Sequence, residues 1–363
     1  MVYLDLLLVG FGHVGQRFAR LLQEKSVALR RDYGLSWRVV GIATRHHGSA
    51  YDARGLDLVK ALKLREAGTA LDALTGAESG RMLAPGASGL ELIRHATGES
   101  KARHLEHLVL VETTLLDIER GQPAIDHVTA ALRGGAHVVT ANKGPVAFAC
   151  RELQSIADLG HRAFLFESAV MDGIPVFNLV RETLPVAEIT GFRGVVNATT
   201  NYILTSMESG RTFDEALREM QQAGIAESDP SFDVDGWDAA AKAAALMNVL
   251  LHGAATPRTI DRSGIRDVTR EAAQAAVSRG KRLRLVARAS GRGAAAAGRV
   301  AVEELDAADP LANLGGMQNL LVLQTDVLGD VGMLQLDGGL IQTAYGLLSD
   351  LTAIARRVGD HEP

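Results

Sequence analysis

The sequence has a single cysteine, no long apolar run and no excess of basic residues. One cysteine, Cys150, excludes an internal disulfide, and a chain without disulfides is typical of the cytoplasm. No uncharged apolar run of about 20 residues occurs, so we predict no membrane span. The N-terminus has no basic segment, and Asp5 interrupts its first apolar stretch, which argues against a signal peptide. The net charge of −5 argues against a nucleic-acid partner, because binding phosphates requires a basic surface.

What is present is the composition of a globular α/β protein. Apolar residues make up 47% and charged residues 22% of the 363 positions, and at about 150 residues per domain this length predicts two domains. Helical segments at 14–24 and 123–133 alternate with short apolar stretches that read as strands, at 3–9, 38–44, 108–112, 136–140 and 163–168. This alternation predicts a Rossmann-like, doubly wound parallel sheet. A second sheet is predicted from strands at 189–196, 281–289, 300–305 and 319–326, and further helices are predicted at 144–159, 212–222, 236–251 and 343–358.

A glycine-rich turn follows the first predicted strand and opens the first predicted helix. Its residues are Gly10, Phe11, Gly12, His13, Val14 and Gly15. In this context the spacing is the fingerprint of a dinucleotide-binding site. The first glycine allows the tight turn, the second lets the backbone approach the pyrophosphate, and the third lets helix and strand pack closely. The N-terminus of the helix attracts the phosphates, although a purely structural turn is an alternative interpretation.

The second predicted strand ends in Arg45 rather than in an acidic residue. Sites that prefer NAD usually carry an Asp or Glu at this point, where it binds the ribose hydroxyls. Arg45 is instead suited to a 2′-phosphate, so the sequence favours NADP over NAD. The alternative is that Arg45 is an ordinary solvated cation.

Two lysines are candidate catalytic residues. Lys143 follows a predicted strand, and ligands of open α/β sheets bind just beyond the carboxyl ends of their strands. Asp238 and Lys242 are four residues apart on an alanine-rich helix and therefore share one face. A surface lysine and a surface ion pair are the respective alternatives. Residues 227–235 contain four acidic residues, more than one helix start needs, and such a cluster is suited to the ammonium of an amino-acid substrate.

Residues 224–242, GIAESDPSFDVDGWDAAAK, closely resemble the signature of the homoserine dehydrogenase family. Four further stretches agree with that family, namely residues 136–143, 167–175, 194–204 and 338–343. The resemblance covers nearly the whole chain. It implies the short form of the family, without a regulatory ligand-binding domain or a fused aspartokinase.

The resemblance implies an NAD(P)-dependent oxidoreductase that interconverts L-homoserine and L-aspartate 4-semialdehyde in the biosynthesis of threonine, methionine and isoleucine. It further implies a cytoplasmic homodimer. Together with the strand and helix pattern, it predicts a dinucleotide-binding domain at residues 1–143, completed by a C-terminal helix at about 340–363. A domain for substrate binding, catalysis and dimerisation is predicted at 144–339.

The resemblance also implies roles for individual residues. Lys143 and Lys242 are the implied catalytic residues. The implied substrate-binding residues are Glu227, Asp233, Asp238 and Thr199. Thr113, Lys143 and Gly338 join the glycine turn and Arg45 as cofactor-binding residues. A site for a monovalent cation, Na⁺ or K⁺, is implied at the backbone around Glu167, Val170, Asp172 and Ile174.

Two other functions are compatible with these residues. One is an NADP-dependent dehydrogenase of another small hydroxy or semialdehyde acid. The other is a cofactor-binding sensor without turnover, which the full set of charged residues disfavours.

Overall fold

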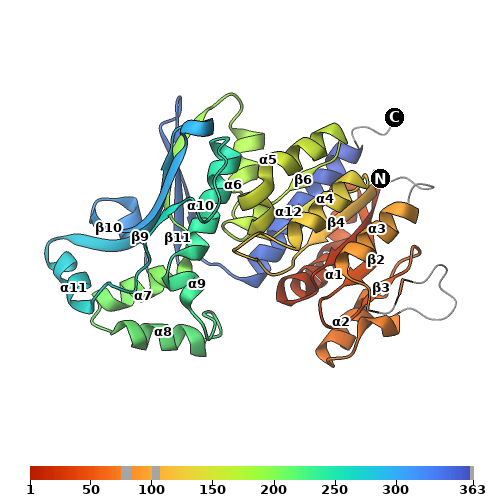
Figure 1. The fold of residues 1–363 in the computed structure, drawn as a ribbon, viewed down its shortest axis with the longest axis horizontal. Coiled ribbons are helices and arrows are strands. Elements are labelled where there is room, and N and C mark those ends of the chain that lie inside the picture. The colour runs from red at the N-terminus through yellow and green to blue at the C-terminus, as the bar shows by residue number, and fades with distance from the viewer. Residues whose placement is uncertain (75–82, 85, 100–106, 360–363) are drawn as a thin grey trace. The chain divides into compact units, whose positions relative to one another are not determined.

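A computed structural model describes residues 1–74, 83–84, 86–99 and 107–359. The chain forms two compact units (Figure 1). Unit 1 comprises Met1–Pro145, Ala149–Pro175 and Gly339–Pro363, and unit 2 comprises Val146–Phe148 and Val176–Gly338. Among the described residues, no helix is long and apolar enough to cross a membrane.

Unit 1 is built on a six-stranded sheet in the order β3-β2-β1-β4-β5-β6. All its pairs are parallel except that of β2 with β3. The strands are β1 (Val2–Val9), β2 (Leu35–Ala43), β3 (Ser49–Tyr51), β4 (Leu108–Glu112), β5 (His137–Thr140) and β6 (Phe164–Leu165). The strand order reverses between β1 and β4, and this switch point is where doubly wound sheets bind ligands. The predicted α/β class is therefore confirmed.

The helices of unit 1 are α1 (His13–Tyr33), α2 (Leu58–Glu66), α3 (Gly89–Glu99), α4 (Ala124–Arg133), α5 (Lys143–Leu159) and α12 (Leu340–Gly359). The last helix, α12, packs against α1 and β1, and its buried Leu347, Leu351 and Ile354 join the same apolar core. Burying these large side chains contributes roughly 1.5–3 kcal/mol each. The C-terminal helix therefore belongs to unit 1, whose sheet is formed by strands from the N-terminal half of the sequence.

One predicted domain boundary is wrong. Residues 149–175 were expected in the second domain, but they belong to unit 1. The reason is that β6 pairs in parallel with β5 and so extends the first sheet. The strand predicted at 163–168 is also shorter than expected, because the chain turns into a 3₁₀ helix at Glu167–Ala169.

Unit 2 contains a second six-stranded sheet in the order β12-β11-β7-β9-β10-β8. Its strands are β7 (Ile189–Val195), β8 (Asp261–Arg262), β9 (Lys281–Ser290), β10 (Ala297–Asp306), β11 (Asn319–Thr325) and β12 (Asp330–Gln335). Its helices are α6 (Val176–Asn178), α7 (Ala198–Glu208), α8 (Phe213–Gln222), α9 (Ser231–Val234), α10 (Trp237–Leu250) and α11 (Arg270–Ser278). The sequence did not predict α7, α11 or β12.

Helix α10 packs on β9 and β10 (Figure 1). Its alanines, from Ala239 to Ala245, are all buried, and their small side chains let the helix lie close against the sheet. Helices α7 and α11 pack on β9. The result is a packed layer of helices on a mainly antiparallel sheet, and the first turns of α7 and α10 carry the polar residues described below.

Candidate functional site

The glycine turn lies at the switch point of the unit 1 sheet, between β1 and α1. Gly10 has a φ of +90°, and a Cβ built there would lie 2.5 Å from the carbonyl carbon of Thr113. A Cβ on Gly15 would collide with the carbonyl oxygen of Gly10. These two glycines are therefore required by the packing of the turn itself, whatever it binds.

Gly12 differs from Gly10 and Gly15, because a side chain at this position would not collide with the protein. It is exposed, its φ is −81°, and a Cβ built on it meets nothing within 4 Å. It is the N-cap of α1, whose first-turn amides have no partner within the helix. A small cradle of backbone N–H groups at the start of a long helix fits a pyrophosphate.

We predict that Gly12→Ala leaves the folded protein unchanged but weakens NADPH binding. The melting temperature should stay within about 1 °C of wild type, whereas the Kd for NADPH, measured by calorimetry, should rise about tenfold, about 1.4 kcal/mol. Gly15→Ala is the contrasting variant, because its collision with Gly10 should lower the melting temperature. If Gly12→Ala binds NADPH as wild type does, the turn does not hold the pyrophosphate.

Arg45 lies in the tight turn that joins β2 to β3, and its side chain is exposed. The structure brings an acid to this turn that the sequence analysis missed. Asp72 Oδ1 accepts a hydrogen bond of 3.2 Å from the Ser49 amide, and a Cβ on Gly48 would collide with the same carboxyl group. Asp72 thus closes the turn from a distant part of the chain, while Arg45 is left facing solvent.

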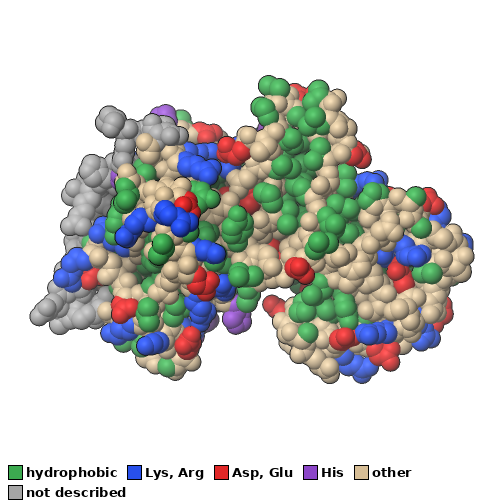
Figure 2. All heavy atoms as spheres, turned by 180° about the vertical axis from the view of Figure 1, so that it is seen from behind, with side chains coloured by type: hydrophobic (Ala, Val, Ile, Leu, Met, Phe, Trp, Pro, Cys, Tyr) green, Lys and Arg blue, Asp and Glu red, His purple; other side chains and the backbone are tan. Residues whose placement is uncertain are grey.

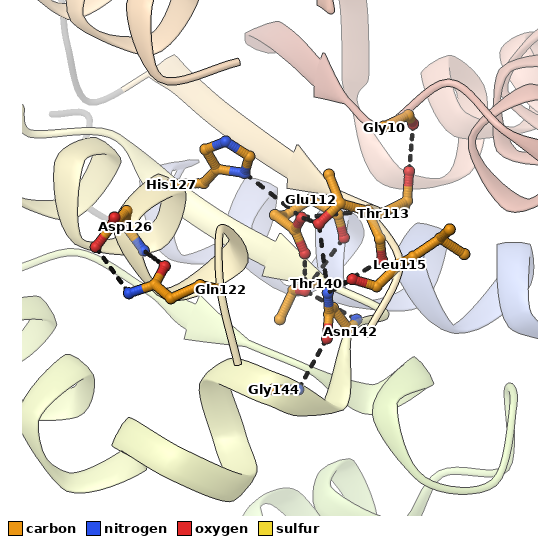
Figure 3. Close-up of polar contacts among 11 residues, drawn as sticks. Gly10, Glu112, Thr113, Leu115, Gln122, Asp126, His127, Thr140, Asn142 and Gly144 are labelled. Carbon is orange, nitrogen blue, oxygen red and sulfur yellow. Dashed lines mark hydrogen bonds and ion pairs between the residues drawn. The ribbon is translucent and has the colours of Figure 1, made fainter. Parts of the chain in front are cut away.

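Thr113 follows β4 and lies beside the glycine turn (Figure 3), and Lys143 follows β5 at the same carboxyl end of the sheet. The Thr113 hydroxyl donates a short hydrogen bond to the carbonyl oxygen of Gly10. Lys143 is the first residue of α5, and Asn142 caps that helix by accepting a hydrogen bond of 2.8 Å from the Gly144 amide. The cofactor residues predicted in unit 1 therefore lie at or just beyond the carboxyl ends of β1, β2, β4 and β5. Gly338 is exposed and is the last residue of unit 2.

The segment predicted to bind a cation, residues 167–174, is hydrogen-bonded to α12 and to the residue just before that helix. The Glu167 amide donates a hydrogen bond of 2.8 Å to the buried carboxyl group of Asp350. The Asp172 carboxyl group accepts from the Gly339 amide and from the Thr343 hydroxyl, which lies 2.9 Å away. The described residues contain no group of three or more His, Cys, Asp or Glu side chains that fits a metal. The carbonyl groups of Val170 and Ile174 remain predicted ligands, and the cation site stays a prediction.

In unit 2, residues from three segments form one polar cluster, here called the α10 cluster: Asn197, Thr199, Asp233, Asp238 and Lys242. Asn197 Nδ2 donates to Asp233 Oδ1 at 2.7 Å and to Asp238 Oδ2 at 2.9 Å. Lys242 Nζ lies 2.9 Å from Asp238 Oδ2 and donates to the Val196 carbonyl oxygen at 2.5 Å. The i, i+4 pair read from the sequence is therefore a largely buried ion pair rather than a surface one.

The α10 cluster shifts the pKa of one of its carboxyl groups. Burial raises the pKa of Asp233 above its ordinary value, and the neighbouring Asp238 raises it further. Hydrogen bonds from Asn197 and Thr199, together with the charge of Lys242, act in the opposite direction. A further cation bound beside Asp233 would stabilise the ionised form of this residue.

Among the described contacts, none joins the Glu227 side chain to the α10 cluster. Glu227 is exposed in the loop before α9, and its described contact is through its backbone carbonyl oxygen, which accepts a hydrogen bond from Gln221. Asn197 is the residue of the cluster to which the sequence analysis gave no role. Its side chain accepts from the Thr200 amide as the N-cap of α7, and because the sequence did not predict that helix, it gave no capping signal for Asn197.

Comparison with known proteins identifies the family. A family model described as homoserine dehydrogenase matches residues 175–352. The chain is 35% identical to a homoserine dehydrogenase of Methanocaldococcus jannaschii, and the match covers 97% of this chain and 98% of that protein. The chain belongs to the homoserine dehydrogenase family. It is therefore an NAD(P)-dependent oxidoreductase, as the resemblance implied.

The cofactors named for two further relatives differ. An NAD(+)-dependent homoserine dehydrogenase of Pseudomonas canavaninivorans is 32% identical, over 98% of this chain and 97% of its own. A solved hyperthermophilic archaeal homoserine dehydrogenase in complex with NADPH superimposes with a TM-score of 0.78 at 31% identity, and the match covers 98% of each chain. Homoserine dehydrogenases of this length therefore occur with either cofactor.

Proposed function

We propose that this protein catalyses the reversible NAD(P)-dependent interconversion of L-homoserine and L-aspartate 4-semialdehyde, in the biosynthesis of threonine, methionine and isoleucine. The observation that carries the proposal is the α10 cluster, in which the buried Asp238 and the partly buried Asp233 lie together with the ammonium of Lys242. The ammonium of an amino-acid substrate would add a positive charge beside these two carboxyl groups. The relative from Methanocaldococcus jannaschii, which this chain matches over nearly its full length, is a homoserine dehydrogenase.

Four residues of unit 2 are assigned to substrate binding, and Lys242 is assigned to catalysis. Asp233 and Asp238 bind its ammonium, Thr199 supports Asp233, and Glu227 adds a carboxylate from the loop before α9. Because the pKa of Asp233 is raised in the free protein, homoserine should bind more weakly as the pH falls through that raised value. Lys242, held by Asp238 and by the Val196 carbonyl group, is the residue that we assign to the reacting oxygen.

A bound nicotinamide would supply or accept the hydride at C4 of the substrate. The residues of the chain have to handle the proton that moves on the oxygen of the same carbon, and we assign this proton to Lys242 and Lys143. The glycine turn, Thr113 and Gly338 are assigned to the cofactor.

We propose NADP as the preferred cofactor, because Arg45 is exposed just after β2 and an arginine at this point is suited to a 2′-phosphate. Asp72, which contacts the same turn, accepts a hydrogen bond from the Ser49 amide. We also propose that Na⁺ or K⁺ binds the backbone near Glu167, Val170, Asp172 and Ile174.

Initial rates of homoserine oxidation with NAD⁺ and with NADP⁺, each in sodium and in potassium salts, test these assignments. We expect turnover with homoserine and a higher kcat/KM with NADP⁺. Equal rates with both cofactors would contradict the role of Arg45. Turnover of a different small hydroxy acid, but not of homoserine, would favour the alternative dehydrogenase, and cofactor binding without any turnover would favour a sensor.

We infer that the protein acts as a homodimer in the cytoplasm. Hydrophobic side chains gather over the sheet of unit 2 (Figure 2). Val327 and Leu328 at the β11–β12 turn, and Leu334 and Leu336 at the end of β12, are all exposed. Exposed apolar groups of this kind often mark protein interfaces. Sedimentation velocity should show a particle of twice the 38.5 kDa chain mass, and a particle of single mass would contradict the inference.

A further inference from the structure

A buried carboxyl group to which the proposed chemistry gives no role lies at the carboxyl end of β4. Glu112 is the last residue of that strand, and its side chain has no exposure to solvent. Its strand neighbours in the sheet are Val9 of β1 and Thr140 of β5. Glu112 therefore lies at the sheet edge where the glycine turn begins and Lys143 follows.

The two oxygens of Glu112 accept hydrogen bonds from two different segments (Figure 3). Oε1 accepts from the Thr114 amide at 3.1 Å and, through a short contact, from the Thr114 hydroxyl. Oε2 lies 3.0 Å from the Thr140 hydroxyl. The first segment includes Thr113, whose own hydroxyl donates to Gly10.

Thr140 links Glu112 to the segment that contains Lys143. Its hydroxyl oxygen accepts a hydrogen bond of 3.0 Å from the Asn142 amide. The Asn142 side chain in turn donates to the Thr114 carbonyl oxygen at 3.0 Å and caps α5 through the Gly144 amide. The loop after β4 and the start of α5 are thus joined to one buried carboxyl group and to each other.

We propose that Glu112 is a positioning residue for cofactor binding, which holds Thr113 and Lys143 in register with the glycine turn. The proposal rests on the proposed function in assigning those two residues to the cofactor. Burying a carboxyl group costs free energy unless its oxygens find donors, and an apolar side chain would fill the same space in the core without that cost. All the hydrogen bonds described for the Glu112 carboxyl group come from the loop after β4, which contains Thr113, and from the end of β5, which leads to Lys143.

His127 of α4 adds a second observation. Its ring is buried, its Nδ1 lies 3.7 Å from Glu112 Oε1, and that nitrogen has no hydrogen-bond partner among the described residues. A small displacement of the carboxyl group would bring the two atoms into hydrogen-bonding range. Glu112 is therefore surrounded by polar groups on the side of α4 as well as on the side of the loops (Figure 3).

Glu112→Gln and Thr140→Val test the proposal. The glutamine keeps the shape of the side chain but turns one acceptor oxygen into an N–H donor, which then faces a hydroxyl or an amide that also donates. We expect the Kd for NADPH, measured by calorimetry without substrate, to rise about tenfold, and kcat to fall while the KM for homoserine stays close to wild type. Thr140→Val removes the hydroxyl that donates to Glu112 and accepts from the Asn142 amide, but it leaves the hydrogen bonds from Thr114 to Glu112 in place. We therefore expect a smaller rise, about threefold, in the same Kd.

Thr97→Val is the matched control, because it removes a buried threonine hydroxyl of α3 that binds only carbonyl groups of its own helix among the described residues. It should bind NADPH as wild type does. The proposal is overturned if Glu112→Gln and Thr140→Val melt like the control and bind NADPH within about twofold of wild type. If Glu112→Gln does not fold, Thr140→Val decides alone. If wild type lacks homoserine turnover but the variants still lose NADPH affinity, the proposed function fails and the positioning role stands.

Discussion

Replacing Lys242 with methionine should lower kcat for homoserine oxidation by at least about a hundredfold, which is the lower end of what a positioned general acid or base contributes. The Lys242 ammonium is held between the Asp238 carboxyl group and the Val196 carbonyl oxygen, and methionine can make neither contact. NADPH binding, measured by calorimetry, should be unchanged, because the glycine turn lies in the other unit. Steady-state kinetics at saturating homoserine and NADP⁺ measure the loss.

The same substitution leaves Asp238 buried without its cation, and breaking a buried pair from one side costs about 3–5 kcal/mol. A loss of activity could therefore reflect unfolding. The double variant Asp238→Asn, Lys242→Met removes both charges and should melt at a higher temperature than Lys242→Met while remaining inactive. Lys281→Met, which breaks an ion pair with Asp306 at the edge of the same unit, should keep full activity. Near-native kcat in a folded Lys242→Met enzyme would refute the catalytic assignment.

The sequence predicted unit 1 better than unit 2, and the reason lies in the local signals. Strand β1 is almost continuously apolar and buried, and the glycine turn marks its end. Helix α7 has no comparable signal. Its first turns read Ala198-Thr199-Thr200-Asn201-Tyr202, residues of which most favour helices weakly. The helix forms because Asn197 caps it and because it packs on α8 and β9, contacts that the sequence does not display.

The candidate site was predictable only where its residues are neighbours on one element. Asp238 and Lys242 share a helix face, so their spacing predicted their ion pair. Asn197 and Asp233 reach the same pair from other segments, and their convergence depends on the order of the strands and the packing of α7. Glu112 reads as an ordinary strand end in the sequence, and only the placement of β4 between β1 and β5 shows that it is buried.

Asn197→Asp should move the acid limb of kcat/KM for homoserine to higher pH. The substitution keeps the shape of the side chain but replaces the amide that donates to Asp233 and Asp238 with a third acid. The pKa of Asp233 is already raised by burial and by Asp238, and the Asn197 amide is one of three groups that lower it, together with Lys242 and Thr199. Removing that amide and adding a negative charge therefore raises the pKa of Asp233 further. Since protonated Asp233 cannot pair with the substrate ammonium, activity should be lost at a higher pH than in wild type.

On the acid side of the profile, kcat/KM of the variant should therefore lie below that of wild type by about tenfold for each pH unit by which the acid limb moves. The KM for homoserine should change more than the Kd for NADPH. Asn319→Asp is the matched control, because Asn319 is also buried in unit 2 and donates to a side chain, Gln335, at 3.0 Å. That variant should lose stability without moving the pH profile of kcat/KM. If Asn197→Asp folds and its acid limb coincides with that of wild type, Asp233 does not bind the substrate ammonium, and the substrate assignment of the α10 cluster has to be revised.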